Sequence, residues 1–208
     1  LAAQTYQQLL DGYPQHATAP AARYGLAWAL VDLGQADDAV VALAPLLSDD
    51  SRRRGTEPGD PAATHELHIA SIELLVWCRH EQGRPDLAEK AWKALEALSP
   101  GSERLLASAR TVSAAWVTAG QPDKAQALLD QLAEDGALAP AALVEATWVA
   151  LDAGDLQAAQ DTISRALTLA ADNRDVAEAA FFVAEAHFAA GDDGLALPLY
   201  HAAASAAA

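Results

Sequence analysis

The chain has 208 residues, 52% of them hydrophobic, and a formal net charge of −16 at neutral pH. This acidic balance argues against nucleic acid as a partner, because phosphate binding needs clustered Lys and Arg side chains. No apolar run is long enough to span a bilayer, so we expect no membrane insertion. The single cysteine excludes an internal disulfide framework and fits the cytoplasm, which we slightly favour, as well as the periplasm.

The apolar residues are dominated by Ala and no alternating strand pattern appears, so the sequence predicts an all-α protein. Charge is distributed unevenly: residues 123–208 include 14 acidic and 3 basic side chains, whereas residues 65–122 include 7 and 6. We interpret the acidic excess as a solvated outer surface, and the alternative is a surface that selects a basic partner. The chain starts at Leu1 without an initiator methionine, so we expect a piece of a longer protein.

Residues 1–14 predict a first helix, which ends at Gly12 and Pro14. Its apolar face is formed by Ala2, Tyr6, Leu9 and Leu10. Because no helix precedes it in the sequence, we interpret it as a half-repeat, the second half of a helical hairpin.

Five helix–turn–helix units follow, each with a glycine at its turn. These glycines are Gly34, Gly83, Gly120, Gly154 and Gly191, at intervals of 49, 37, 34 and 37 residues. Five residues after each glycine stands an Ala, and nine residues after each stands a large apolar residue (Leu43, Trp92, Leu129, Ile163 and Tyr200). Landmarks that recur with a period of about 34 predict tandem repeats. We place these repeats at residues 20–47, 65–100, 101–137, 138–171 and 172–208.

This pattern resembles the tetratricopeptide repeat (TPR) family over essentially the whole chain, and the opening YQQLLDGYP resembles repeats of bacterial envelope proteins. The resemblance implies a right-handed α-solenoid of about five hairpins plus the N-terminal half-repeat, with a non-catalytic role in protein–protein interaction. Two positions depart from the family, since Arg79 and Ala150 stand where a large aromatic residue is expected. Ala166 and Ala203 also leave the last two units lightly packed.

Residues 48–64 interrupt the period and are rich in Pro, Gly and charge, which predicts an inserted, exposed loop. Pro61 and Thr64 lead into the next helix. The only basic cluster of the chain lies in this loop, at Arg52, Arg53 and Arg54. We interpret it as a solvated loop tip, and the alternative is docking on an acidic surface of this chain or of a partner.

Motifs of catalytic chemistry do not occur in the sequence. There is no phosphate-binding glycine loop, no Ser-centred nucleophile elbow and no isolated carboxylate pair. His65 and His68 could face one ligand, but no third ligand stands at the spacing of a zinc site, so we interpret them as a surface pair. Cys78 lies in an apolar helix and is expected to be buried rather than nucleophilic. We therefore predict no enzyme, no cofactor and no metal site.

The TPR resemblance implies that the first helix of each hairpin lines an inner, concave face. The candidate groove residues stand ten, six, three or two positions before the turn glycines: Tyr24, Trp28, Asp32, Glu73, Trp77, His80, Glu81, Arg110, Trp148, Asp152, Phe181, Glu185 and Phe188. Three of the five tryptophans share the position six before the glycine. The other two, Trp92 and Trp116, fall at positions expected to pack between helices.

We predict that these residues form an aromatic, mildly acidic groove that binds a peptide or helix of apolar to basic character. One alternative is that the rings are core packing residues of the solenoid. The inward Lys and Asn residues of the family's carboxylate clamp are absent, and Arg110 is the sole inward cation. Two further alternatives are self-association into a homo-oligomer and a recruiting or sensory arm of a larger enzyme or regulator.

Overall fold

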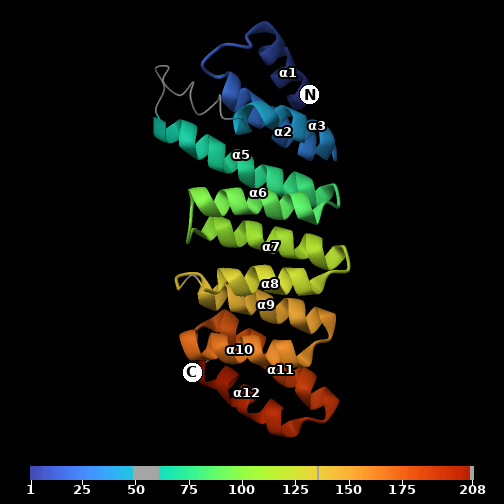
Figure 1. Ribbon diagram of the computed structural model, residues 1–208, viewed down its shortest axis with the longest axis vertical. Coiled ribbons are helices and arrows are strands. Elements are labelled where there is room, and N and C mark those ends of the chain that lie inside the picture. The colour runs from blue at the N-terminus through green and yellow to red at the C-terminus, as the bar shows by residue number, and fades with distance from the viewer. Residues whose placement is uncertain (49–60, 135, 207–208) are drawn as a thin grey trace. The chain divides into compact units, whose positions relative to one another are not determined.

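The computed structural model describes residues 1–48, 61–134 and 136–206. In this part of the chain every regular element is a helix, which confirms the all-α prediction (Figure 1). The helices are α1 (Ala2–Gly12), α2 (Ala19–Val31), α3 (Ala36–Leu47), α5 (Pro61–Glu81), α6 (Pro85–Leu98), α7 (Glu103–Thr118), α8 (Pro122–Leu132), α9 (Ala139–Ala153), α10 (Leu156–Ala170), α11 (Arg174–Ala190) and α12 (Asp193–Ala206). Helix α5 begins inside the segment 48–64 that the sequence predicted as a loop, since proline suits the first turn of a helix. The basic run 52–54 lies outside the described residues.

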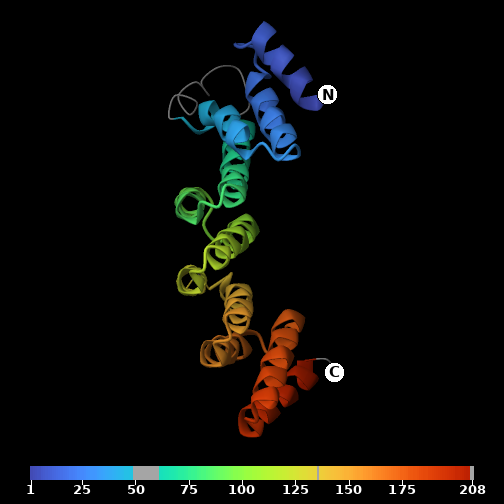
Figure 2. The same ribbon diagram turned by 90° about the vertical axis from the view of Figure 1, so that its right-hand side faces the viewer.

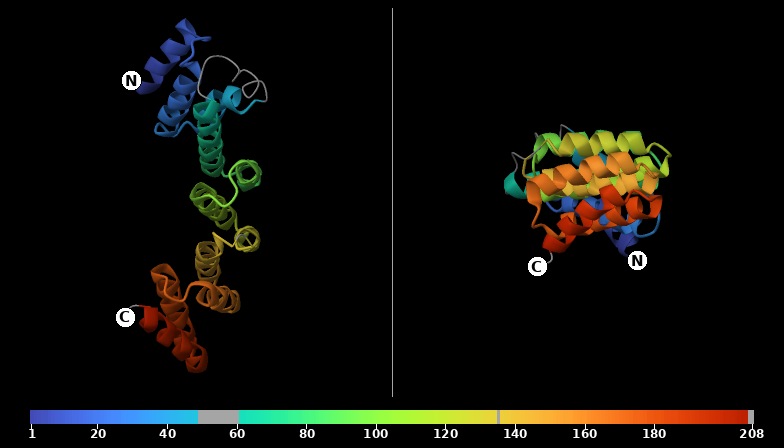
Figure 3. Two further views of the ribbon diagram at one scale, coloured as in Figure 1. Left: turned by 90° about the vertical axis from the view of Figure 1, so that its left-hand side faces the viewer. Right: turned by 90° about the horizontal axis from the view of Figure 1, so that it is seen from below.

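The helices form two compact units, Leu1–Pro100 and Gly101–Ala208, which we call the N-terminal unit and the C-terminal unit. In the N-terminal unit α2 pairs with α3 and α5 with α6, while α1 packs on α2 and α3 packs on α5. In the C-terminal unit α7 pairs with α8, α9 with α10 and α11 with α12. Within that unit α7, α9 and α11 lie on one side, and α8 and α10 on the other (Figures 2 and 3). None of the described helices is both long and apolar enough to cross a membrane.

Each of the five predicted turn glycines ends a helix in the left-handed region, with φ between 63° at Gly83 and 86° at Gly191. A side chain would be strained there, which explains the choice of glycine. In all five turns the residue after the glycine donates its backbone N–H to the carbonyl five residues earlier at 2.9 Å, as Gln35 does to Leu30. The same closure therefore sets the entry angle of the second helix in every hairpin.

Small and large buried residues meet where the paired helices cross, which allows close approach. The alanines five positions after the turn glycines are all buried (Ala39, Ala88, Ala125, Ala159 and Ala196). The large residue nine positions after the glycine is fully buried in the first four hairpins, whereas Tyr200 in the last is partly exposed. Trp92 and Trp116 are buried, which confirms their prediction as packing residues.

The first helix, predicted at residues 1–14, is confirmed as α1, and it lies on the surface of the N-terminal unit. None of its residues is buried. The Tyr6 ring lies so close to Gly25 of α2 that an added Cβ there would be 2.6 Å from Tyr6 Cζ. The missing side chain at Gly25 therefore makes room for the Tyr6 ring of α1 against α2.

Cys78 and His68 of α5 are both buried, but only the burial of Cys78 was predicted. Cys78 is fully buried in α5, as predicted, and burial raises the pKa of its thiol to about 11. His68 was predicted to be a surface residue and this was wrong. It is buried, with its Nδ1 at 3.0 Å from the Leu46 carbonyl oxygen of α3, whereas His65 is exposed. A hydrogen bond to the end of α3 satisfies the buried ring, which makes its burial tolerable.

Candidate functional site

A pocket of about 220 Å³ opens on the side of the C-terminal unit formed by α7, α9 and α11. It lies between α9 and the N-terminal half of α11, and α7 contributes one side chain. The lining residues that carry its charge and its aromatic character are Arg110, Glu145, Trp148, Asp175 and Glu178. The pocket therefore combines one cation, three carboxylates and an indole ring.

The single cation of the pocket is already paired. Arg110 Nε donates to Glu145 Oε1 at 2.7 Å, across the space between α7 and α9. Asp175 and Glu178 lie on the α11 side, and both are exposed. Asn173 caps this helix, because its side chain accepts the backbone N–H groups of Asp175 and Val176 at 2.8 and 3.2 Å. The carboxylates of Asp175 and Glu178 make the α11 side of the pocket negative.

Trp148 connects the pocket to a row of aromatic rings, which we call the aromatic cluster: Trp148, Phe181, Phe182 and Tyr200. The Trp148 and Phe182 rings meet edge to face with centroids 5.3 Å apart. Phe182 contacts Phe181 at 5.7 Å, and Phe181 contacts Tyr200 of α12 at 5.8 Å. Phe181 and Phe182 keep 44% and 46% of their surface exposed, so part of this cluster is open to a ligand.

The last ring of the cluster is tied back to α11. Tyr200 donates its hydroxyl hydrogen to the Glu185 carboxylate. Because this bond needs the protonated phenol, it raises the pKa of Tyr200 to about 12. The bond fixes the ring of α12 against α11 and thereby supports Phe181.

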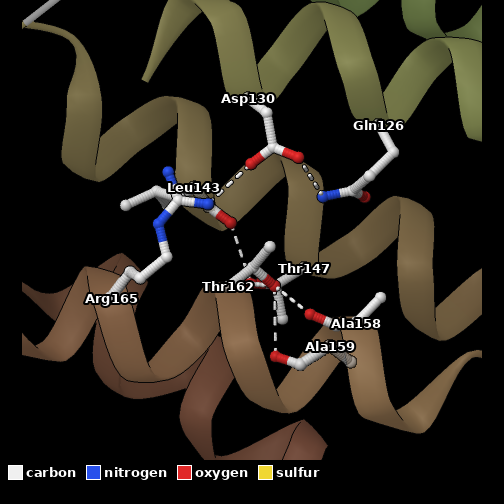
Figure 4. A network of polar contacts seen from close by, with 8 residues as sticks. All are labelled: Gln126, Asp130, Leu143, Thr147, Ala158, Ala159, Thr162 and Arg165. Carbon is white, nitrogen blue, oxygen red and sulfur yellow. Dashed lines mark hydrogen bonds and ion pairs between the residues drawn. The ribbon is translucent and has the colours of Figure 1, made fainter. Parts of the chain in front are cut away.

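Next to Trp148 in the sequence, Thr147 makes polar contacts that hold α9 against α10 (Figure 4). Thr147 is fully buried and its hydroxyl bonds the Leu143 carbonyl at 2.8 Å and the Thr162 hydroxyl of α10 at 2.9 Å. On α10, Arg165 Nη1 pairs with Asp130 of α8 at 2.7 Å. The Thr147–Thr162 bond joins α9 to α10 and the Arg165–Asp130 pair joins α10 to α8, so the helix that carries Trp148 is fixed against its neighbours.

The N-terminal unit carries two aromatic pairs of its own. Tyr24 and Trp28 of α2 meet edge to face at 6.4 Å, and Trp77 and His80 of α5 meet at 5.8 Å. Trp28 and Trp77 are 45% and 43% exposed. Both indoles therefore have an open face, although they share a repeat position with the half-buried Trp148.

The structure brings together some of the predicted groove residues. Arg110 and Trp148 line one pocket, and Phe181 and Glu185 join it through Phe182 and Tyr200. Other predicted residues lie outside this pocket: Asp152 and Phe188 in the same unit, and Tyr24, Trp28, Asp32, Glu73, Trp77, His80 and Glu81 in the N-terminal unit. A single groove through all five hairpins stays a prediction.

Sequence reasoning missed four residues of the site, Glu145, Asp175, Glu178 and Phe182. Glu145 and Phe182 stand nine positions before a turn glycine, Gly154 and Gly191 respectively, and this position was not considered. The pocket residue Glu178 stands thirteen positions before Gly191. Positions ten and nine stand three and four residues after position thirteen, and position six stands four and three residues after them, so the four positions share one helix face. That spacing was the available signal.

No protein-family model and no curated protein matches this sequence. Solved structures do match its fold. The nearly identical TPR-like repeats of a kinesin light chain-like protein from Podosopora anserina align with a TM-score of 0.53 at 18% identity, over 92% of this chain and 96% of theirs. BtubC (BKLC) from P. vanneervenii aligns with a TM-score of 0.54 at 15% identity, over 99% and 86%.

The chain is therefore an α-solenoid of helical hairpins. More particularly, its fold is that of TPR-like repeat proteins, as the sequence resemblance implied. The bacterial type of the repeats stays a prediction.

Proposed function

We propose that this chain is a non-catalytic interaction module that binds a protein or peptide segment. Its principal binding face is the side of the C-terminal unit formed by the pocket and the aromatic cluster. The exposed rings of α2 and α5 serve the same function on the N-terminal unit.

The observation that carries this proposal is the continuity between the pocket and the half-exposed rings beside it. Trp148 lines the pocket and contacts Phe182, so a ligand seated in the pocket would also cover the rings. Aromatic side chains supply large contact areas at little entropic cost and are enriched among residues that dominate binding energy. Exposed rings beside a concave site are typical of binding surfaces rather than of a core.

The proposal is tested by selecting ligands with the whole chain from a phage-displayed library of short random peptides. The selected peptides are then synthesised and their affinities measured by calorimetry for the native chain and for Trp148→Ala and Phe182→Ala. Each substitution should weaken binding by at least about tenfold, the scale expected when a dominant interface residue is truncated.

The matched control is Leu169→Ala on α10, because Leu169 is 58% exposed and lies outside the pocket. This variant should bind like the native chain. Far-UV circular dichroism confirms that all variants remain helical. The proposal fails if the library yields no binding peptide, or if the selected peptides bind Trp148→Ala and Phe182→Ala as tightly as the native chain.

A further inference from the structure

We infer that the pocket of the C-terminal unit takes a Lys or Arg side chain of an extended segment, while the aromatic cluster takes an apolar side chain two residues away. The ligand class is thus a segment of the form basic–any–apolar. This inference rests on the proposed function and deepens it, because it names the chemistry that the binding face selects.

Charge selects the basic side chain. The C-terminal unit carries 15 acidic and five basic residues in its sequence. In the pocket the charges of Arg110 and Glu145 offset each other across 2.7 Å. Within the described residues Asp175 and Glu178 have no ion-pair partner, so two carboxylates at the pocket are left without a counter-charge. A cation there gains attraction, and an anion is repelled.

Trp148 provides a second reason for a cation. Its indole ring lines the same pocket as Asp175 and Glu178. Ammonium and guanidinium groups are attracted to the face of an aromatic ring, and indole is the best such ring. The aliphatic stem of Lys or Arg can also cover apolar surface while its charged end reaches a carboxylate. The pocket thus matches both parts of a long basic side chain.

The spacing of the ligand follows from the geometry of α11. Glu178 and Phe182 are four residues apart, so they lie one turn apart on one face, about 6 Å along the helix axis. In an extended segment, side chains two residues apart point the same way and are separated by about 6.6 Å. A segment lying along α11 can therefore place a basic side chain beside Glu178 and an apolar one on Phe182.

An acidic ligand is the opposite choice, and the pocket is unsuited to it. Arg110 is the only cation among the lining residues, and its Nε is engaged by Glu145. An incoming carboxylate would have to compete for that guanidinium while lying near Asp175 and Glu178. Preference for a basic residue is therefore a property of the pocket as a whole.

Capped synthetic peptides test the inference directly on the whole chain. The first contains Arg-Ser-Phe in a Gly-Ser frame, acetylated and amidated so that no terminal charge remains. The second replaces Arg by Glu, and the third moves Phe next to Arg. The first should bind at least about tenfold more tightly than the second, because the charge pairing is reversed. It should bind about fivefold more tightly than the third, because only one of the two side chains can then be seated.

A charge-neutral double variant, Asp175→Asn with Glu178→Gln, should remove most of the preference for Arg over Glu. The matched control is Asp161→Asn with Asp193→Asn, two exposed residues of the same unit outside the pocket. The control removes the same formal charge and should keep the preference. A similar loss in both double variants would overturn the assignment to the pocket.

The outcomes separate the two proposals. Peptides that bind through Trp148 and Phe182 without a preference for Arg over Glu overturn the inference and leave the proposed function standing. A preference for Glu overturns the inference as well. If no peptide, selected or synthetic, binds the chain, the proposed function fails together with it.

Discussion

Two tryptophans of one hairpin should respond very differently to truncation. Trp92 of α6 is fully buried, whereas Trp77 of α5 is 43% exposed. Replacing Trp92 by Ala removes all of its buried contacts and leaves a cavity, for which a loss of about 3–5 kcal/mol in the free energy of unfolding is expected.

The loss for Trp77→Ala is smaller for three reasons. Slightly over half of an indole area of about 200 Å² is buried, which corresponds to at most about 3 kcal/mol. Part of that burial is retained by Ala, and water fills the space at a surface site instead of leaving a cavity. The better helix propensity of Ala returns about 0.5 kcal/mol. We therefore expect a net loss of about 1–2 kcal/mol.

Urea unfolding followed by far-UV circular dichroism measures the difference. Both residues lie in one hairpin of the N-terminal unit, so the two variants perturb the same part of the fold. With a slope of about 2 kcal/mol per molar urea, the midpoint should fall by about 2 M for Trp92→Ala and by less than about 1 M for Trp77→Ala. Equal shifts would show that Trp77 is a core residue, and the assignment of the repeated tryptophan position to a binding surface would be refuted.

Three further predictions concern local contacts. Gly25→Ala should displace the Tyr6 ring and speed amide hydrogen exchange in α1 by about five- to tenfold, as loss of an aromatic contact implies. Gly12→Ala is the control and should not speed this exchange, because a Cβ there meets nothing within 4 Å. Equal exchange rates in the two variants would contradict the contact between Tyr6 and Gly25. The Tyr200–Glu185 bond should stabilise the fold fully below pH 10, and this stabilisation should be lost as pH rises toward 12. The reason is that the folded phenol keeps the proton that an unfolded chain releases near pH 10. The Tyr200→Phe variant lacks the phenol, so its stability should not show this loss between neutral and alkaline pH. The Cys78 thiol should stay unreactive toward an aromatic disulfide reagent in the folded chain at neutral pH and react on unfolding, and fast native reaction would contradict its burial.

The repeat landmarks were predictable because local backbone chemistry fixes them. Only glycine adopts the positive φ of the hairpin turns without strain, so Gly34 and its four equivalents mark the turns in the sequence itself. Close helix crossings require a small residue, which identified the buried alanines. Trp92 and Trp116 were separated by their repeat position alone from the other three tryptophans, which are exposed or half-buried.

The parts that sequence reasoning missed depend on how separate helices approach one another. His68 is buried because the Leu46 carbonyl at the end of α3 lies beside it, and no local pattern records that approach. The pocket needs side chains from α7, α9 and α11 at different repeat positions, so scanning fixed positions found Arg110 and Trp148 but not Glu178. The bond from Tyr200 to Glu185 likewise depends on the rotation of α12 against α11.

The central claim, that the C-terminal unit binds a peptide on the face of Trp148, is tested most directly by the indole N–H signals of the five tryptophans. A library-selected peptide is titrated into the uniformly ¹⁵N-labelled chain, with Trp148→Phe used to assign the signal. We predict that the Trp148 indole signal shifts progressively while those of the buried Trp92 and Trp116 stay in place. A peptide that binds without moving the Trp148 signal would contradict the account.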